Sequence, residues 1–216
     1  MSIDKTLLNQ LQQAVLVGDE ETVQQLTETA LEGGVAPGDL LDQALISAMD
    51  QVGEEFSCGQ RYIPEMLISA EAMKAAMEIL KPKLIESQVK AKGKVVMGTV
   101  EGDLHDIGQS LVSMMLEGAG FEIHTLGTET LADRFVTAVR EHEADLVGMS
   151  ALLTTTMTNM PKVIEAFEAA GLRDRVKIMI GGAPVTQEYA DKIGADGFAP
   201  DAASAVKLAE RLLEMK

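Results

Sequence analysis

A histidine and an aspartate separated by one residue, Asp103 and His105, are the side chains of this sequence best suited to chemistry. They follow the apolar run Val95–Val100 and precede the amphipathic segment Ile107–Leu116, so we expect them on a strand-to-helix loop. Open α/β sheets place their ligands on such loops. A carboxylate this close can accept the second N–H of the imidazole, which fixes the tautomer and raises the basicity of the other nitrogen. The pair is therefore predicted to present one imidazole nitrogen to a metal.

The composition predicts a folded, soluble, cytoplasmic protein. The 216 residues are 46% hydrophobic, which is enough for one large domain or two small ones. No apolar run reaches the roughly 18 residues of a membrane span, and the N-terminus lacks the features of a signal peptide. A net charge of −16, with 3% aromatic residues, argues against nucleic acid as a partner. The single cysteine, Cys58, cannot form an internal disulfide, and no Cys/His cluster suggests zinc.

Residues 1–90 show the periodicity of four amphipathic helices joined by short loops, which predicts a small all-α four-helix bundle domain. The first expected helix is centred on Leu11. The other three run from Asp19 to Gly33, from Pro37 to Ser57, and from about Ile63 to Leu80. Pro82 is expected just beyond the end of the fourth helix. The stretch Lys81–Gly93 has little apolar periodicity and is interpreted as a linker, with a domain boundary near residue 90.

Residues 91–216 alternate between short β-rich runs and helical segments, which predicts an α/β domain. The expected strands are Val95–Val100, Glu122–Thr125, Leu146–Ser150, Val176–Ile180 and Gly197–Ala199, and the expected helices lie near 107–118, 130–142, 158–170, 186–193 and 201–214. This alternation is typical of a five-stranded parallel sheet of the Rossmann or flavodoxin-like kind, with helices on both faces. The usual order of five such strands is 2-1-3-4-5.

That strand order brings three unusual loops to one edge of the sheet. They are Asp103–Gly108, the segment Ser150–Leu152 continued by Thr154–Thr156, and Gly181–Gly182. The glycines allow a ligand to approach the backbone closely, and the hydroxyls are neutral polar groups. We expect a deep, mostly apolar pocket with few polar groups.

Several common chemistries fit this pocket poorly. A phosphate-accepting receiver domain needs an aspartate where the third strand ends in Ser150, and neither a GxxxxGK[ST] nor a GxGxxG loop is present. Ser150 also lacks the GxSxG surroundings of a hydrolase nucleophile. One histidine and one aspartate cannot close a zinc site, which takes three or four protein ligands. A metal that brings its own equatorial ligands needs only one ligand from the protein.

At this point the sequence resembles a known family, the cobalamin-binding domains. Their signature is DxHxxG, then SxL, then GG, and here it is Asp103-Leu-His105-Asp-Ile-Gly108, Ser150-Ala-Leu152 and Gly181-Gly182. The first two elements are separated by 41 residues and the last two by 28, as in the family. The resemblance implies a cobalamin bound base-off, with His105 replacing the cofactor's own base as the lower axial ligand of cobalt.

The resemblance also implies roles for the neighbouring residues. Asp103 would orient His105, and Thr156 would complete a ligand triad, although Thr156 could equally be a capping residue of the following helix. Further cofactor contacts are expected from the signature and the segments beside it. These contacts are Asp106, Gly108, Ser150, Leu152, Thr154, Gly181 and Gly182.

The helical bundle also resembles a family element, the four-helix cap found in methionine synthase and in the corrinoid proteins of anaerobic methyl transfer. The resemblance covers Gly59–Leu80 and implies that Tyr62, Met66 and Met73 cover the upper face of the corrin. Methionines at helical spacing are also ordinary core residues, and this interpretation stays open.

The implied function is that of a methyl carrier, which is not catalytic alone. Its partners would be a substrate:corrinoid methyltransferase, a corrinoid:tetrahydrofolate or thiol methyltransferase, and a reductive activase. One alternative is the cobalamin subunit of a carbon-skeleton mutase, but such subunits lack the helical cap. Another is a cobalamin-sensing regulator, for which the acidic N-terminal helices have the wrong charge. The sequence does not identify the methyl donor, which could be methanol, a methylamine, betaine or a methoxylated aromatic.

Overall fold

The computed structural model describes residues 5–87 and 90–214, and the chain divides into two compact units. The helical unit comprises Met1–Ala91 with Gly118–Gly120, and the sheet unit comprises Lys92–Glu117 and Phe121–Lys216. In the described ranges, no helix has both the length and the apolar character needed to cross a membrane.

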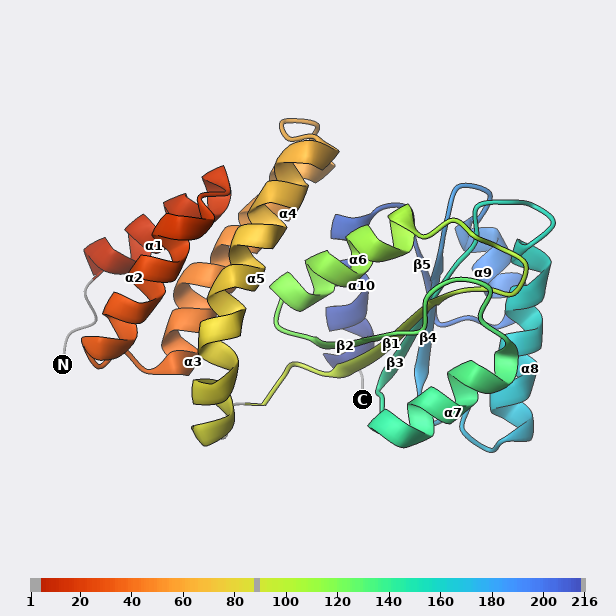
Figure 1. The fold of residues 1–216 in the computed structure, drawn as a ribbon. Coiled ribbons are helices and arrows are strands. Elements are labelled where there is room, and N and C mark those ends of the chain that lie inside the picture. Colours follow the sequence, from red (N-terminus) through yellow and green to blue (C-terminus); the bar gives the residue numbers. More distant parts are fainter. Residues whose placement is uncertain (1–4, 88–89, 215–216) are drawn as a thin grey trace. The chain divides into compact units, whose positions relative to one another are not determined.

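The helical unit is all-α (Figure 1). Its elements are α1 (Lys5–Val17), α2 (Glu20–Glu32), α3 (Pro37–Leu40), the π-helix η1 (Leu41–Ile46), α4 (Ser47–Ser57) and α5 (Ile63–Glu86). The third predicted helix has the expected extent, but its centre is the π-helical segment η1. Leu41 and Ile46, at the two ends of the π-helical segment, are both buried.

The predicted end of the fourth helix near Leu80 is wrong. Helix α5 continues through Pro82 to Glu86, although proline gives up one backbone hydrogen bond. Leu84 explains the extension, because it is buried and continues the apolar stripe of Met77 and Leu80. The first six residues of the predicted linker are therefore helical, and residues 88–89 of that linker lie outside the described residues.

The start of α5 is anchored by Arg61. Its guanidinium pairs with Glu55 at 2.9 Å and donates to the Leu16 carbonyl at 2.8 Å and to the Ser69 hydroxyl at 3.2 Å. The Ser69 hydroxyl donates to the same Leu16 carbonyl at 3.1 Å. This carbonyl is in the last turn of α1, where backbone acceptors lack partners within the helix. Arg61 thus fixes the backbone next to Tyr62.

The sheet unit contains five parallel strands in the order β2-β1-β3-β4-β5, which confirms the predicted fold (Figure 1). They are β1 (Lys94–Thr99), β2 (Glu122–Thr125), β3 (Leu146–Ser150), β4 (Lys177–Gly181) and β5 (Gly197–Ala199). The central strands β1 and β3 are almost continuously buried and rich in Val, Leu and Met, as expected for strands covered on both faces.

The helices of the sheet unit cover both faces (Figure 1). They are α6 (Ile107–Gly118), α7 (Ala132–His142), η2 (Met157–Asn159), α8 (Met160–Ala169), α9 (Gln187–Ile193) and α10 (Ala202–Glu214). Helices α7, α8 and α9 bury one core around Phe135 and Phe167, and α6 and α10 lie on the other face. Alternation along β5 shows the two sides, since Phe198 packs on that core while Gly197 lies against Leu208 of α10.

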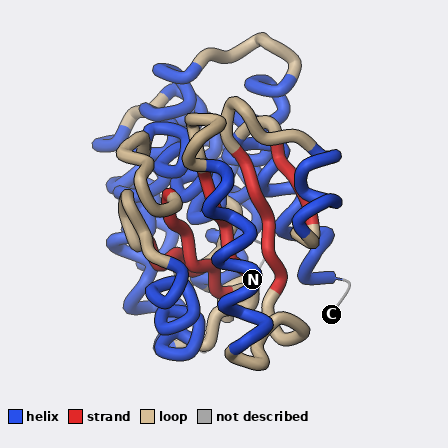
Figure 2. Tube along the Cα trace, turned by 90° about the vertical axis from the view of Figure 1, so that its right-hand side faces the viewer, coloured by secondary structure: helices blue, strands red, loops and turns tan. Residues whose placement is uncertain are grey.

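Four strands end at the same level of the sheet. Thr99, Ser150, Gly181 and Ala199 are successive register partners across β1, β3, β4 and β5. All four residues are small, and the loops that follow them lie at one end of the strands (Figure 2). The register therefore brings the predicted loops together at the carboxyl edge of the sheet.

The close approach of two of these loops generates a testable prediction at Gly182. Its φ is +122°, and a Cβ there would overlap the Ala151 carbonyl oxygen, so Gly182→Ala should destabilise the protein by about 2–5 kcal/mol. Gly194→Ala is the matched control, because Gly194 also has positive φ but a Cβ there would meet no atom within 4 Å. The control should lose only about 1 kcal/mol in urea unfolding. Equal losses would contradict the steric explanation.

Candidate functional site

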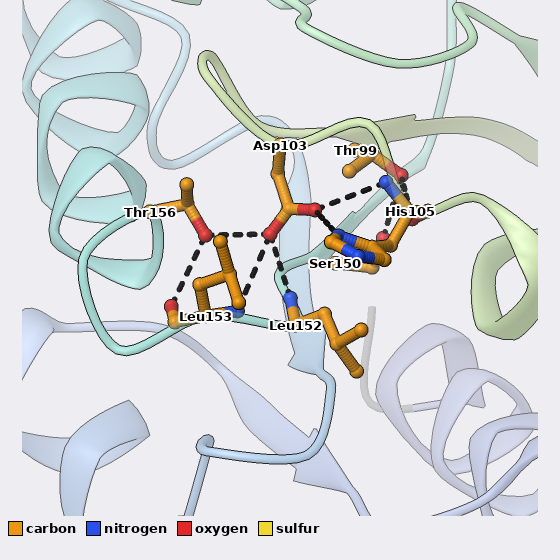
Figure 3. Close-up of polar contacts among 7 residues, drawn as sticks. All are labelled: Thr99, Asp103, His105, Ser150, Leu152, Leu153 and Thr156. Carbon is orange, nitrogen blue, oxygen red and sulfur yellow. Dashed lines mark hydrogen bonds and ion pairs between the residues drawn. The ribbon is translucent and has the colours of Figure 1, made fainter.

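The carboxylate of Asp103 is the centre of the polar site at the carboxyl edge (Figure 3). Its side chain is fully buried and accepts hydrogen bonds at both oxygens. Oδ1 accepts from the His105 backbone N–H at 3.0 Å and ring Nδ1 at 2.7 Å. Oδ2 accepts from the Thr156 hydroxyl at 2.5 Å and from the backbone N–H groups of Leu152 at 2.7 Å and Leu153 at 3.4 Å. One carboxylate thus joins the loops after β1 and β3.

The backbone around Asp103 is held independently of its side chain. The Asp103 N–H donates to the Val100 carbonyl at 3.1 Å, which closes a tight turn after β1. The Asp103 carbonyl accepts from the Glu129 N–H at 3.0 Å, and the Glu101 carbonyl accepts from the Asn159 side chain at 2.7 Å. The turn after β1, the loop after β2 and the helix η2 therefore position the aspartate without any ligand.

The Asp103 carboxyl is ionised at neutral pH. Burial alone would raise its pKa, but hydrogen bonds from Thr156, Leu152 and His105 outweigh burial and hold the pKa well below its usual range. An ionised carboxylate only accepts hydrogen bonds, so the Thr156 hydroxyl and His105 Nδ1 must both act as donors. The tautomer of His105 is thereby fixed with its proton on Nδ1.

His105 is left with one nitrogen available to a ligand. Nδ1 is engaged by Asp103, while 51% of the His105 side chain is exposed, so Nε2 can be reached from outside. Among the described residues, no group of three or more His, Cys, Asp or Glu side chains could hold a metal ion. A metal at His105 would therefore have to bring other ligands of its own.

The structure adds two residues that the sequence analysis did not predict. The Thr99 hydroxyl lies 2.9 Å from the Ser150 hydroxyl and donates to the His105 carbonyl at 3.3 Å, so it ties both neighbouring strands to the His105 loop. Leu153 contributes its backbone N–H to Asp103. A hydroxyl at the last position of β1, in register with Ser150, was the signal for Thr99, whereas a backbone donor leaves no signal in the sequence.

Thr156 had two predicted interpretations, and the hydrogen bonds distinguish them. Its side chain is buried and makes no capping hydrogen bond to η2. The hydroxyl instead lies 2.5 Å from Asp103 Oδ2, and 3.1 Å from the Leu153 carbonyl. Asp103, His105 and Thr156 therefore form a connected triad.

The other predicted site residues of the sheet unit lie around this triad. Asp106, Gly108, Leu152 and Thr154 are exposed, and a Cβ at Gly108 would meet no atom within 4 Å. Their contact with a cofactor stays a prediction.

The predicted residues of the helical unit differ in exposure. Tyr62 is 69% exposed, whereas Met66 and Met73 are buried and contribute to the core. The burial of these methionines agrees with their interpretation as core residues, and their role toward a cofactor also stays a prediction.

Exposed apolar side chains gather on the same loops. In the described part of the sheet unit, every large hydrophobic residue that is strongly exposed follows β1, β2 or β3 at the carboxyl edge. These residues, called the apolar rim below, are Leu104, Ile107, Leu131, Leu152 and Leu153. Exposed apolar groups around a few convergent polar ones are typical of a ligand site.

Comparisons with known proteins agree with this geometry. The B12 binding domain family matches residues 93–207, and a second B12 binding domain family matches residues 7–81. The chain is 44% identical over 208 residues to dimethylamine corrinoid protein 1 of Methanosarcina acetivorans, covering 96% of this chain and 97% of the relative. It is 41% identical over 211 residues to a corrinoid protein of Desulfitobacterium hafniense, covering 96% and 98%.

Two solved structures are similar over most of the chain. The methanol:cobalamin methyltransferase complex MtaBC from Methanosarcina barkeri matches with a TM-score of 0.87 and 29% identity, covering 99% of this chain and 81% of that chain. A cobalamin-binding protein from Desulfitobacterium hafniense DCB-2 matches with a TM-score of 0.78 and 35% identity, covering 95% and 98%. The chain therefore belongs to the family of corrinoid proteins built from B12 binding domains.

Proposed function

We propose that this chain is the methyl carrier of a corrinoid methyltransferase system and binds cobalamin base-off, with His105 as the lower axial ligand. The observation that carries the proposal is the Asp103–His105 pair, which leaves Nε2 available at the carboxyl edge. When bound, the corrinoid supplies a cobalt atom that accepts a methyl group from one enzyme and passes it to another. The macrocycle also supplies the equatorial ligands that the described residues lack.

The residues of the site fit such a group. The apolar rim offers hydrophobic surface beside His105, and Gly108, three residues after His105, is exposed and carries no side chain that could obstruct a ligand. Asp103 keeps His105 in one tautomer and one orientation. His105 would hold the metal through Nε2 while Asp103 keeps its hydrogen bond to Nδ1.

The proposal extends to both domains and to the partners. Residues 91–216 would form the cobalamin-binding domain, and residues 1–90 would form a cap in which Tyr62, Met66 and Met73 face the corrin. A substrate-specific methyltransferase would load the methyl group, and a second enzyme would pass it to tetrahydrofolate or a thiol. A reductive activase would restore the cofactor after oxidation. The names of the dimethylamine and trimethylamine relatives support a methylated amine as the donor.

The direct test is the identity of the axial ligand. Purified protein reconstituted with cobalamin should give a cobalt(II) EPR spectrum whose superhyperfine splitting changes when histidine is labelled with nitrogen-15. The change is expected because His105 Nε2 would be bonded to cobalt. A His105→Ala variant should lose the sensitivity to the label, and His124→Ala should keep it. A labelled wild-type protein whose spectrum matches that of the unlabelled protein would end the proposal.

Asp103 should control how well His105 serves as a ligand. Asp103→Asn should weaken cobalamin binding by about 10–100-fold, because the amide no longer holds the imidazole as a charged acceptor. Absorbance titration of the apoprotein measures the change. The control is Glu101→Gln, which removes an exposed carboxylate two residues away and should bind as the wild type does. Unchanged affinity in Asp103→Asn would exclude this role of the carboxylate.

The lowered pKa of Asp103 predicts how stability depends on pH. A carboxyl group with a folded-state pKa below its unfolded value of about 3.9 stabilises the protein above that pH, and this contribution is lost as pH falls through the folded-state pKa. We compare urea unfolding of His105→Ala with that of Asp103→Asn/His105→Ala, so that the imidazole does not titrate. The difference in unfolding free energy should stay constant between pH 5 and 7 and shrink only below about pH 4. A difference that already shrinks near pH 6 would contradict the lowered pKa.

A further inference from the structure

Tyr189, on α9, makes a hydrogen bond to the segment that supplies donors to Asp103. Its phenol hydroxyl donates to the Met157 carbonyl at 2.8 Å. Met157 is the first residue of η2 and directly follows Thr156. Helix α9 follows β4, whereas η2 follows β3, so the bond joins two different loops of the carboxyl edge. A side chain outside the triad therefore holds the backbone next to it.

The fold places the Tyr189 hydroxyl and keeps it a donor. Tyr189 and Met157 both pack against the core around Phe135 and Phe167, so apolar contacts fix the ring. Burial raises the pKa of the phenol, which therefore keeps its proton at neutral pH. The Met157 carbonyl already accepts from the Met160 N–H at the end of η2. The bond from Tyr189 is thus not needed to satisfy this carbonyl, and it adds a constraint on where η2 lies.

The constrained segment stabilises the Asp103 carboxylate (Figure 3). Oδ2 of Asp103 accepts from the Thr156 hydroxyl and from the Leu152 and Leu153 N–H groups. The Leu153 carbonyl in turn accepts from the Met157 N–H at 3.0 Å. A displacement of Met157 would therefore also displace the donors that Asp103 depends on.

We infer that Tyr189 is a positioning residue of the corrinoid site, which holds Thr156 and the neighbouring N–H groups against Asp103 and so keeps the His105 imidazole in the orientation that binds cobalt. The inference rests on the proposed function. Asp103 is fully buried, so its charge depends on donors that stay in place. No contact between Tyr189 and the cofactor is needed, because the effect passes through Thr156.

Cobalamin binding to the full-length apoprotein tests the inference. Tyr189→Phe removes the hydroxyl and keeps the ring, and it should weaken binding about threefold to tenfold, as expected for the loss of one hydrogen bond. Thr156→Val removes the hydroxyl that Tyr189 is inferred to position. In the Thr156→Val background, Tyr189→Phe should therefore weaken binding further by less than about twofold.

Thr186→Ala is the matched control for a general loss of stability. The Thr186 hydroxyl caps α9 by accepting from the Tyr189 N–H at 3.1 Å. Loss of this cap should lower the melting temperature by about 2–4 °C. The bond from the Tyr189 hydroxyl to Met157 remains, so the affinity for cobalamin should equal that of the wild type.

Amide hydrogen exchange in the unliganded protein gives a readout that does not depend on cobalamin. The Leu152 N–H donates to Asp103 at 2.7 Å, and its exchange should become about threefold to tenfold faster in Tyr189→Phe but not in Thr186→Ala. The Ile178 N–H is the internal reference, because it donates to another carboxylate, that of Asp196, at 2.8 Å. Its exchange should be the same in both variants.

Three outcomes would overturn the inference. An unchanged affinity in Tyr189→Phe would show that the hydroxyl does not support the site. Equal weakening with and without the Thr156 hydroxyl would show that Tyr189 does not act through Thr156. Exchange that becomes equally fast at Leu152 and Ile178 would show only a general loss of stability. A wild-type protein that binds no cobalamin would instead overturn the proposed function, while exchange at Leu152 would still show whether Tyr189 positions the donors of Asp103.

Discussion

The Asp103 carboxylate is buried and yet ionised, and the geometry of the site depends on this combination. Burial disfavours the charge, so the carboxylate is stable only while hydrogen-bond donors from two loops surround it. On one loop the donors include the Thr156 hydroxyl and the Leu152 N–H. On the other loop the donors are the backbone N–H and the ring Nδ1 of His105. The loops after β1 and β3 are thus held together by one anion, and the orientation of the imidazole follows from it.

The parallel sheet makes this arrangement possible. Neighbouring parallel strands end at the same edge, so residues about 50 positions apart in sequence, such as Thr99 and Ser150, become register partners. Their hydroxyls meet, and Thr99 also holds the His105 carbonyl. Farther along the same row, Gly181 and Ala199 leave space at the carboxyl edge, because glycine has no side chain and that of alanine is a single methyl group. The sheet therefore supplies polar anchors beside β1 and space beside β4.

Sequence periodicity predicted the strands and helices because buried strands and amphipathic helices leave clear apolar patterns, as in Leu146–Ser150, and the strand order followed from the usual order of five-stranded sheets of this kind. The signature residues Asp103 and His105 could be predicted because one short loop contains both. Leu153 could not, since a backbone N–H leaves no signal in the sequence, and Thr99 is recognised as a site residue only once the strand register pairs its hydroxyl with that of Ser150. Pro82 misled the prediction for another reason: proline usually ends a helix, but the burial of Leu84 extends this one.

The site combines polar groups whose hydrogen bonds are formed within the protein with apolar groups that are left exposed. The hydrogen bonds that orient His105 form within the chain itself, so a ligand that binds Nε2 meets an imidazole that needs no rearrangement. The apolar rim is different, because exposed apolar side chains are removed from water only by a partner. The orientation of the imidazole is therefore a property of the fold, whereas the exposed apolar surface beside it remains open to a partner.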